Sequence, residues 1–394
     1  MNKKSDKRGI STTAVHAGEA RKKFADSLTT PIVQTSTYIF HDEVDIAEYT
    51  SGKKYRYEYL RYGNPTVDAA ERKLADLEGA EAALLFSSGM AAITTTLFSL
   101  LKTGDHIIIT NDIYKKTMQF AQNDLARFGV SHSMVAPTAE ALAAAVRPET
   151  ALIFTESPTN PYVHVVDLSK LVPVAKKAGI PVIIDSTFAT PYNLKPLEYG
   201  VDMVIHSATK YLAGHNDILA GVVCGTAADI KKLKAFQKTT GANIDPHVAY
   251  LLIRGLKTFA LRVKFQNESA LKIARRLEKH PKVKRVWHPG LPSHPSHKIA
   301  KKQMKGFGSC FAFETNGTLK QTQKFLRSLQ VILMGPSLGG VESLISHPAT
   351  ITYYDMTRAQ RYALNQTDQL CRLSVGIEDT EDLMADLDQA LAKM

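Results

Sequence analysis

Residues 201–217 read VDMVIHSATKYLAGHND, and this stretch decides the fold. An apolar run, DMVIHS at 202–207, ends at Ser207 and leads directly to Thr209 and Lys210. A run this apolar is typical of a strand that is buried on both faces of a parallel sheet. Open α/β sheets collect their functional groups at the carboxyl ends of such strands. The stretch therefore predicts an α/β fold with a functional lysine at one edge of its sheet.

Two further segments deliver polar groups in the same way. PVIIDST, 181–187, carries Asp185 at the end of an apolar strand. LLFSSGMAAITTTL, 84–97, is typical of a strand, a turn at Ser88 and Gly89, and a helix that starts near Met90. Free backbone N–H groups at a helix N-terminus bind anions. Together the three strand ends predict one site with a lysine, a carboxylate and an anion cradle.

The rest of the chain extends this α/β pattern. Apolar runs alternate with amphipathic helices, which predicts a mostly parallel sheet covered by helices; the runs are 82–88, 106–110, 151–157, 181–187, 202–207 and 221–225. A long helical stretch near 243–281, a strand near 308–315 and a final strand and helix predict a smaller α+β domain. We expect Thr380 to cap that last helix, with acidic residues in its first turn.

We predict three regions: an extended arm over 1–60 that contacts a neighbouring subunit, a large domain over 61–255, and a small domain over 256–394. The sequence has 394 residues, and its three cysteines lack the spacing of a disulfide framework or a zinc site. Its polar start and the lack of an 18-residue apolar run favour a cytoplasmic protein. The net charge of +11 comes from scattered Lys and Arg residues, so we expect no nucleic-acid partner.

Lys210 and Asp185 at buried strand ends each need a partner, because an unpaired buried charge costs several kcal/mol. One alternative is that they pair with each other. The other is a cofactor between them, and pyridoxal phosphate matches each part: a lysine for its aldehyde, an acid for its ring nitrogen and a helix N-terminus for its phosphate. A lysine held at a strand end, with its pKa lowered by burial, suits attack on an aldehyde.

Six segments give the chain a resemblance to a known family. In order they are YEYLRYGNPT (57–66), SSGMAA (87–92), ESPTNP (156–161), IIDSTFATP (183–191), HSATKYLAGHND (206–217) and CRLSVGIEDTEDL (371–383). In this order and spacing they resemble the Cys/Met-metabolism family of pyridoxal-phosphate enzymes along nearly the whole chain. The resemblance implies fold type I and a homotetramer built from dimers with shared active sites. It also implies that the enzyme acts on small amino-acid substrates.

The resemblance also implies roles for single residues. Lys210 would carry the aldehyde and move protons, Asp185 would keep the ring nitrogen protonated, and Tyr114 would stack on the ring. The remaining residues would bind the phosphate or the substrate: Tyr59 and Arg61 from a neighbouring subunit, Gly89, Met90, Ser207 and Thr209 for the phosphate, and Asn160 and Arg372 for the substrate α-carboxylate. Without the others, Tyr59 and Tyr114 would be ordinary core aromatics and Arg372 an ion-pair partner.

Two features bear on which reaction the family member catalyses. GPSLGGVESLISHPA, 335–349, places Glu342 before Ser343, where a carboxylate can hold the amino group of cysteine or of the distal half of cystathionine; the alternative is a solvated loop residue. Lys115 and Lys116 could bind an anionic leaving group, or they could be exposed lysines at a helix start. The resemblance favours γ-replacement that joins cysteine to an O-activated homoserine. Elimination at Cγ and at Cβ remain alternatives on the same site.

Two interpretations outside catalysis are a scaffold protein and a metal site. A non-catalytic binding or scaffold protein would explain the fold but not the strand-end pair of Lys210 and Asp185. The histidines of WHPGLPSHPSHK, 287–298, are separated by prolines and lack the fixed helical spacing of a ligand set, so we expect no metal.

Overall fold

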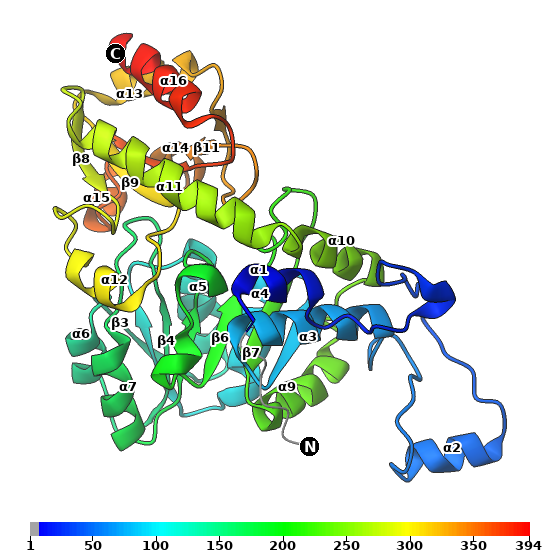
Figure 1. Cartoon of the computed structure of the whole chain (residues 1–394). Coiled ribbons are helices and arrows are strands. Elements are labelled where there is room, and N and C mark those ends of the chain that lie inside the picture. Colours follow the sequence, from blue (N-terminus) through cyan, green and yellow to red (C-terminus); the bar gives the residue numbers. More distant parts are fainter. Residues whose placement is uncertain (1–7) are drawn as a thin grey trace.

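The computed structural model describes residues 8–394 and has two parts, each built on a sheet (Figure 1). The first seven residues of the predicted arm lie outside the described residues. The larger part lies below in Figure 1 and the smaller part, which carries the C-terminus, lies above it. No helix within 8–394 combines the length and the apolar character that crossing a membrane requires.

The larger sheet confirms the prediction of a mostly parallel α/β core. Its seven strands follow the order β1-β7-β6-β5-β4-β2-β3. Strands β2 to β6 are parallel, and β7 runs antiparallel to both β1 and β6. The strands are β1 (Ala82–Phe86), β2 (His106–Thr110), β3 (Ser131–Val135), β4 (Thr150–Glu156), β5 (Val182–Asp185), β6 (Met203–His206) and β7 (Gly221–Gly225).

All six predicted apolar runs form strands, and the structure adds β3, which the sequence did not reveal. Its sequence, SHSMV, is polar, and its residues are at most half-buried because β3 lies at the edge of the sheet. An edge strand needs no continuous apolar run, so a search for such runs misses it.

Helices cover both faces of this sheet (Figure 1). Side chains of α4 and α9 pack with Ile107 and Ile109 in one core, whereas α6 and α7 pack with Ile108 in another, as the two-residue period of a strand requires. The helices of this part are α3 (Pro65–Glu78), α4 (Gly89–Leu100), α5 (Lys115–Gln119), η2 (Phe120–Leu125), α6 (Ala139–Ala144), α7 (Leu168–Lys177), α8 (Thr190–Asn193), η3 (Pro196–Tyr199), α9 (Ala227–Thr240) and α10 (Pro246–Leu256).

The smaller part has five strands in the order β10-β11-β12-β9-β8. All neighbours are antiparallel except β10 and β11. The strands are β8 (Val283–Trp287), β9 (Cys310–Thr315), β10 (Leu333–Met334), β11 (Leu344–Ser346) and β12 (Leu370–Ser374), and the helices are α11 (Phe259–Glu278), α12 (His297–Gln303), α13 (Leu319–Ser328), α14 (Pro348–Ile351), α15 (Arg358–Ala363) and α16 (Thr380–Ala392). This confirms the predicted small α+β unit.

One detail of the predicted small domain is wrong, and another gains detail. The predicted helical stretch is confirmed as two helices, because α10 ends at Leu256 and α11 begins at Phe259. Thr380 does not cap α16: the N-cap is Asp379, and the Thr380 hydroxyl instead donates to Ser269 Oγ at 2.9 Å. The break between α10 and α11 lies beside the proposed domain boundary near residue 255, which stays a proposal.

The predicted extended arm is only partly extended. It contains α1 (Ile10–His16), η1 (Phe24–Asp26) and α2 (Glu43–Thr50), and over 8–60 its β pairing is a single bridge between Thr37 and Tyr59. Helix α1 packs on α3 and α11, whereas α2 projects away from the body at the end of two long connecting segments (Figure 1). Large apolar side chains on the projecting part are solvent-exposed, with Ile39 at 75% and Val44 at 64%. Such a segment suits contact with a second subunit.

Candidate active site

Asp185 and Ser207 meet at the carboxyl ends of β5 and β6. Asp185 is the last residue of β5, and its Oδ1 accepts from the backbone N–H and the hydroxyl of Thr187, at 2.9 and 2.5 Å. The Thr187 hydroxyl oxygen in turn accepts from Ser207 N at 2.8 Å. Burial raises the pKa of the Asp185 carboxyl, and the two bonds from Thr187 oppose that rise. Thr187 thus fixes the carboxylate relative to the loop that leads to Lys210.

The predicted anion cradle falls on the first turn of α4. Ser88 is its N-cap, and its side chain accepts from Ala91 N at 3.0 Å. A Cβ at Gly89 would lie 2.8 Å from Ser207 Cβ and 3.0 Å from Ser207 Oγ. Only glycine therefore lets the N–H groups of this turn, including that of Met90, approach Ser207 so closely. Backbone donors and a hydroxyl at a helix N-terminus suit a phosphate.

The Thr209 side chain is already hydrogen-bonded within the protein. Its hydroxyl donates to Ala220 O at 3.2 Å, and its oxygen accepts from Ala220 N at 2.9 Å. These bonds fasten the loop after β6 to the start of β7. The hydroxyl therefore has a structural partner in addition to any role in binding phosphate.

Lys210 and Arg372 come from different parts of the molecule and meet at Ser337. Lys210 Nζ donates to Ser337 Oγ at 3.0 Å, and the Arg372 guanidinium donates to Ser337 O at 3.2 Å, to Pro336 O at 2.7 Å and to Asn160 Oδ1 at 3.1 Å. Burial, with a smaller effect from Arg372, lowers the pKa of Lys210 to about 8. A substantial fraction of the amine is therefore neutral near neutral pH and able to act as a nucleophile or base.

Three simpler interpretations from the sequence do not fit this geometry. Within 8–394 no ion pair joins Lys210 to Asp185, and the Arg372 guanidinium contacts carbonyl and amide oxygens rather than a carboxylate. Tyr59 and Tyr114 are 37% and 43% exposed, so neither is a core aromatic. The charged and aromatic side chains thus remain available for a ligand.

Glu156 is a buried carboxyl that the sequence analysis missed. It ends β4 in register with Asp185, and its Oε1 accepts from Tyr114 N at 2.8 Å. Its Oε2 is buried and has no hydrogen-bond partner among the described residues. Burial, reinforced by the neighbouring Asp185, raises the pKa of Glu156 well above its usual value. The sequence signal was present, because an acid ends this apolar strand just as Asp185 ends the next one in the sheet.

The two lysines after Tyr114 point to different surroundings. Lys115 is buried and interacts with Thr352 and Asp355 of the smaller part, so it is not the exposed lysine of the second alternative. Lys116 is exposed, and its charge helps to lower the pKa of Asp355 after the larger effect of Lys115. Only Lys116 is free to meet a substrate.

Glu342 and Ser343 also differ from each other. The exposed Glu342 accepts from Asn216 Nδ2 at 2.7 Å, so its carboxylate is held by the loop that follows Lys210. A Cβ at Gly340 would lie 2.2 Å from that same Nδ2, so the glycine lets the two loops touch. Ser343 is buried, and its hydroxyl donates to Glu378 Oε2 at 2.8 Å. Glu342 is therefore the better placed of the two to contact a ligand.

Tyr59 and Arg61 lie where the predicted arm meets the large domain and are not brought to Lys210. The Arg61 guanidinium lies 5.1 Å from the centroid of the Tyr59 ring, and its buried Nε has no hydrogen-bond partner within the described chain. No contact among residues 8–394 joins either side chain to Asp185 or Ser207. A buried donor without a partner is costly, which favours an acceptor that this chain alone does not supply.

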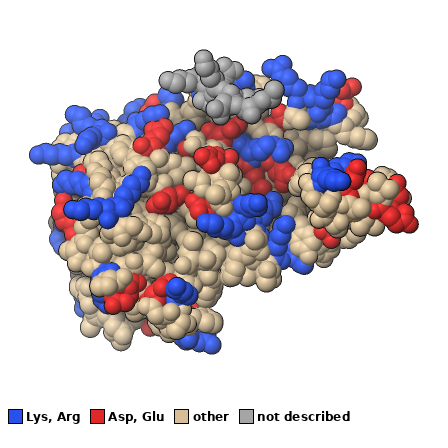
Figure 2. Space-filling model, turned by 90° about the horizontal axis from the view of Figure 1, so that it is seen from below, with Lys and Arg blue, Asp and Glu red and all other residues tan. Residues whose placement is uncertain are grey.

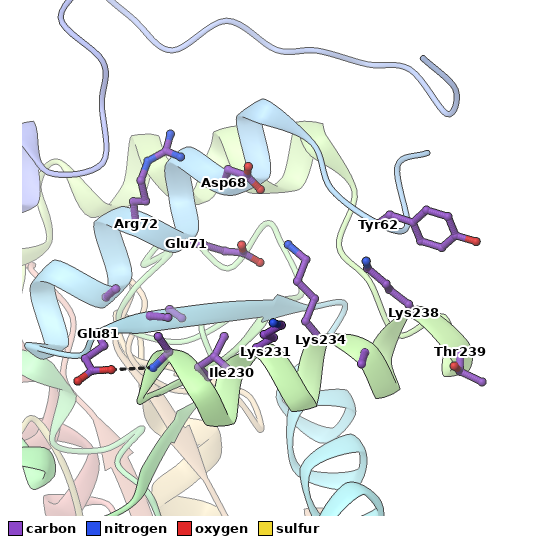
Figure 3. Close-up of a pocket in the computed structure, with 15 residues that line it drawn as sticks. Tyr62, Asp68, Glu71, Arg72, Glu81, Ile230, Lys231, Lys234, Lys238 and Thr239 are labelled. Carbon is purple, nitrogen blue, oxygen red and sulfur yellow. Dashed lines mark hydrogen bonds between the residues drawn. The ribbon is translucent and has the colours of Figure 1, made fainter. Parts of the chain in front are cut away.

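A cavity of about 790 Å³ lies elsewhere, between α3 and α9 beside β1 (Figure 3). Charged side chains of both signs line it, and blue and red side chains lie together over this side of the molecule in Figure 2. Its acids are already engaged: Glu71 accepts from Leu85 N at 3.0 Å and Glu81 from Ala227 N at 2.9 Å. Glu71 and Gln237, which donates to Leu85 O, cover the free edge of β1, whereas Glu81 binds the first residue of α9. The cavity contains none of the predicted site residues.

The histidines of 287–298 serve as structural partners. His294 Nε2 donates to Tyr162 O at 3.0 Å, His297 Nδ1 to Pro289 O at 2.8 Å, and His288 Nδ1 accepts from Gly290 N at 3.0 Å. In the chain from residue 8 onward, no three His, Cys, Asp or Glu side chains gather in a way that could hold a metal ion.

The observed arrangement of side chains and backbone groups fits pyridoxal phosphate. A lysine with a lowered pKa, a buried carboxylate fixed by Thr187, and a glycine-permitted helix N-terminus beside Ser207 supply the three contacts that this cofactor requires. On a seven-stranded, mainly parallel sheet with a small C-terminal sheet, they define a fold-type I pyridoxal-phosphate enzyme. The chain belongs to the Cys/Met metabolism PLP-dependent enzyme family, whose model matches residues 11–392.

Comparisons with known proteins place the chain among trans-sulfuration enzymes. It is 45% identical to cystathionine gamma-synthase 1, chloroplastic, from Arabidopsis thaliana, over 96% of this chain and 68% of that protein. It is 44% identical to a cystathionine beta-lyase from Coxiella burnetii and 42% identical to an L-methionine gamma-lyase from Fusobacterium nucleatum, with 98–99% of this chain and 99% of each relative covered. The crystal structure of metB from Corynebacterium glutamicum matches with a TM-score of 0.92 at 38% identity, covering 98% of both chains.

The comparisons confirm the family, the fold and the cofactor, and they make this protein a pyridoxal-phosphate enzyme of trans-sulfuration. The relatives divide between synthase and lyases at similar identity, so they leave the exact reaction open. The Arabidopsis relative is chloroplastic by name, and the cytoplasmic location of this chain stays a prediction.

Proposed function

We propose that the enzyme is a cystathionine γ-synthase, which forms cystathionine from cysteine and an O-activated homoserine. The observation that carries the proposal is Glu342, an exposed carboxylate held by Asn216 on the loop that follows Lys210. A carboxylate there can bind the ammonium group of the incoming cysteine through a charge-assisted hydrogen bond. The Arabidopsis relative named as a cystathionine gamma-synthase supports the same reaction.

The proposed role of Lys210 is to move protons between substrate carbons. When bound, pyridoxal phosphate supplies an electron sink that stabilises negative charge on the substrate. Lys210 would take a proton from Cα, pass it on to regain its free amine, and then take one from Cβ, and the second loss would expel the γ-ester with the electron pair of its C–O bond. The cysteine thiol would lose its proton to the released anion as its sulfur bonds to Cγ, and Lys210 would return one proton to Cβ and one to Cα. An amine with a pKa of about 8 can both accept and donate at neutral pH.

The other site residues would bind and orient. Asp185 would hold the ring nitrogen protonated, Tyr114 would stack on the ring, and Arg372 with Asn160 would bind the substrate α-carboxylate. The phosphate would be held by Gly89 and Met90 N–H groups, by Ser207 and Thr209, and by Tyr59 and Arg61 of the partner subunit. Lys116 would face the anionic leaving group, and Glu342 with Ser343 would face the cysteine that takes the place of that group at Cγ.

A product assay tests the proposed reaction. Purified enzyme with pyridoxal phosphate receives cysteine with O-acetyl-, O-succinyl- or O-phosphohomoserine in separate reactions, and cystathionine alone in another. Cystathionine formed from one ester supports the synthase and identifies its leaving group. Consumption of cystathionine to cysteine and 2-oxobutyrate, or to homocysteine and pyruvate, without synthesis would make the enzyme a γ- or β-lyase, the reactions that the other relatives favour.

Replacing Glu342 by alanine is expected to raise KM for cysteine about 10- to 100-fold, because a charge-assisted hydrogen bond contributes about 1.5–3 kcal/mol. The KM for the homoserine ester should change little, which initial-rate kinetics with each substrate varied in turn will show. Glu149→Ala is the matched control, since Glu149 is an exposed glutamate at the amino end of β4. An unchanged KM for cysteine in Glu342→Ala would leave the proposed contact without support.

The partner-subunit role of Arg61 predicts complementation between two inactive variants. Arg61→Ala and Lys210→Ala subunits, mixed at equal amounts, form mixed dimers in which one of the two sites has both residues. Random pairing of two subunits should restore about a quarter of the wild-type activity. Mixing Lys210→Ala with Lys210→Arg is the control and should restore none. If the first mixture is equally inactive, the sites are not shared in this way. A tetramer built from two such dimers would appear at four chain masses in light scattering.

A further inference from the structure

Lys115 is the feature that the proposed reaction leaves without a role. It follows Tyr114 at the first position of α5, yet its side chain is only 6% exposed. Its Nζ donates to Thr352 O at 2.9 Å, forms a short ion pair with Asp355 and lies 5.2 Å from the centroid of the Tyr353 ring. One buried ammonium thus has three partners within four consecutive residues, 352–355.

These partners belong to the other part of the molecule. Segment 352–355 joins α14 to α15 and lies between β11 and β12, two paired strands of the smaller sheet. Lys115 itself follows β2 of the larger sheet. The contact therefore spans the two parts, with partners 237 and 240 residues away in the chain.

The segment that Lys115 contacts also borders the candidate active site. Tyr353 is buried, and burial together with the nearby carboxyls of Asp112 and Glu156 raises its pKa to about 12, while Arg372 opposes that rise. Tyr353 therefore lies within electrostatic reach of Arg372 on one side and of Glu156, which holds Tyr114 N, on the other.

The contact that Lys115 makes differs from the other contacts that join the two parts near the site. Lys210–Ser337 and Arg372–Asn160 use groups to which the proposed function gives roles in proton transfer and substrate binding. The Lys115 contact uses no such group and can persist throughout the reaction. Separating it would leave a buried ammonium without its carboxylate, which is strongly unfavourable.

We propose that Lys115 is a positioning residue that clamps segment 352–355 of the smaller part to the loop carrying Tyr114, and so sets the separation between Tyr114 and Arg372. The inference rests on the proposed roles of these two residues in holding the cofactor ring and the substrate α-carboxylate. A looser clamp would weaken substrate binding without removing any group that contacts substrate.

Two variants test the clamp from its two ends. Lys115→Met keeps a long apolar stem but removes the ammonium, and Asp355→Asn keeps the shape of the acid but removes its charge. Asp355 is 46% exposed, so its variant should fold even if the buried change at Lys115 does not. Lys170→Met is the matched control, because Lys170 forms a 2.8 Å ion pair with Glu140 that stays within the larger part.

The first measurement is hydrogen exchange at the amides of residues 352–356, in cofactor-loaded enzyme. Their protection comes from bonds such as Tyr353 N to Pro348 O and Met356 N to Tyr353 O. We expect these amides to exchange faster in Lys115→Met and Asp355→Asn than in the wild type. In Lys170→Met the exchange rate should stay at the wild-type value. This readout does not depend on which trans-sulfuration reaction the enzyme catalyses, so it can fail or succeed independently of the proposed function.

The second measurement is KM for the amino-acid substrate that the product assay identifies. We expect a rise of about tenfold in each variant, the change that corresponds to 1.4 kcal/mol, with cofactor affinity unchanged. The double variant should add little, because both changes break one contact. Unchanged exchange in both single variants would overturn the clamp. Faster exchange with an unchanged KM would overturn its role in substrate binding.

Discussion

Replacement of Lys210 by alanine is expected to lower kcat about 10⁴-fold or more, and to leave pyridoxal phosphate bound without a covalent link to the protein. The variant loses both the amine that attacks the aldehyde and the base that moves protons, and a general base alone contributes about 10²–10⁴-fold. Steady-state kinetics measures the first effect. Borohydride reduction followed by mass spectrometry of the peptide containing residue 210 measures the second.

Lys210→Arg separates the covalent role from the positive charge. Arginine keeps the charge near Ser337 but stays protonated and cannot attack the aldehyde. It should be as inactive as the alanine variant. A reducible covalent adduct in either variant, or a loss of less than about tenfold in kcat, would show that another residue acts in place of Lys210.

The lowered pKa of Lys210 gives this prediction a pH dependence. The amine must be neutral to attack the aldehyde, and with a pKa of about 8 the neutral fraction rises about tenfold from pH 7 to pH 9 and then levels off. Uptake of pyridoxal phosphate by apoprotein should follow this curve. A lysine at its ordinary pKa would give a rate that still climbs about tenfold per unit above pH 9.

The sequence could predict the large sheet because its central strands are buried on both faces. Strands β5 and β6 consist of apolar residues up to a polar last residue, Asp185 or His206. A short, continuous apolar run of this kind indicates a strand buried on both faces of a sheet. The edge strand β3 and the two arm helices gave no comparable signal. Apart from the buried Ala14 in α1, their residues are half-buried or exposed, so local sequence does not constrain them to one pattern.

The candidate site could be predicted where its residues belong to strand ends, and not where distant loops supply them. Asp185, Ser207 and Lys210 follow two strands within 26 positions of each other. Ser337, which joins Lys210 to Arg372, lies 127 residues beyond Lys210 in a stretch from which the sequence analysis singled out only Glu342 and Ser343. The environment of Lys115 was also invisible, because tertiary packing rather than local sequence decides which of two adjacent lysines is buried. Glu156 was missed although its strand end carried the same signal as Asp185.

Replacing Asp185 by asparagine is expected to lower kcat about 10²–10³-fold, the loss typical of removing one preorganised electrostatic group. The amide keeps the shape of the side chain and can still accept from Thr187, but it cannot hold a protonated ring nitrogen by charge. The cofactor would then withdraw electrons less strongly, and removal of the first substrate proton would slow. Kinetics at saturating pyridoxal phosphate separate this effect from weaker cofactor binding.

Asp202→Asn is the control that distinguishes electrostatics from stability. Asp202 stands just before β6 and accepts from Val182 N at 2.8 Å, so it binds the amino end of the same strand that Asp185 ends. Its replacement should lower thermal stability slightly and leave kcat unchanged. A primary isotope effect with Cα-deuterated substrate should increase in Asp185→Asn, because the proton transfer becomes more rate-limiting. Equal losses of kcat in both variants would mean that Asp185 acts through folding. An unchanged isotope effect would mean that it does not govern the proton step, and the charge of the buried carboxylate would then need another explanation.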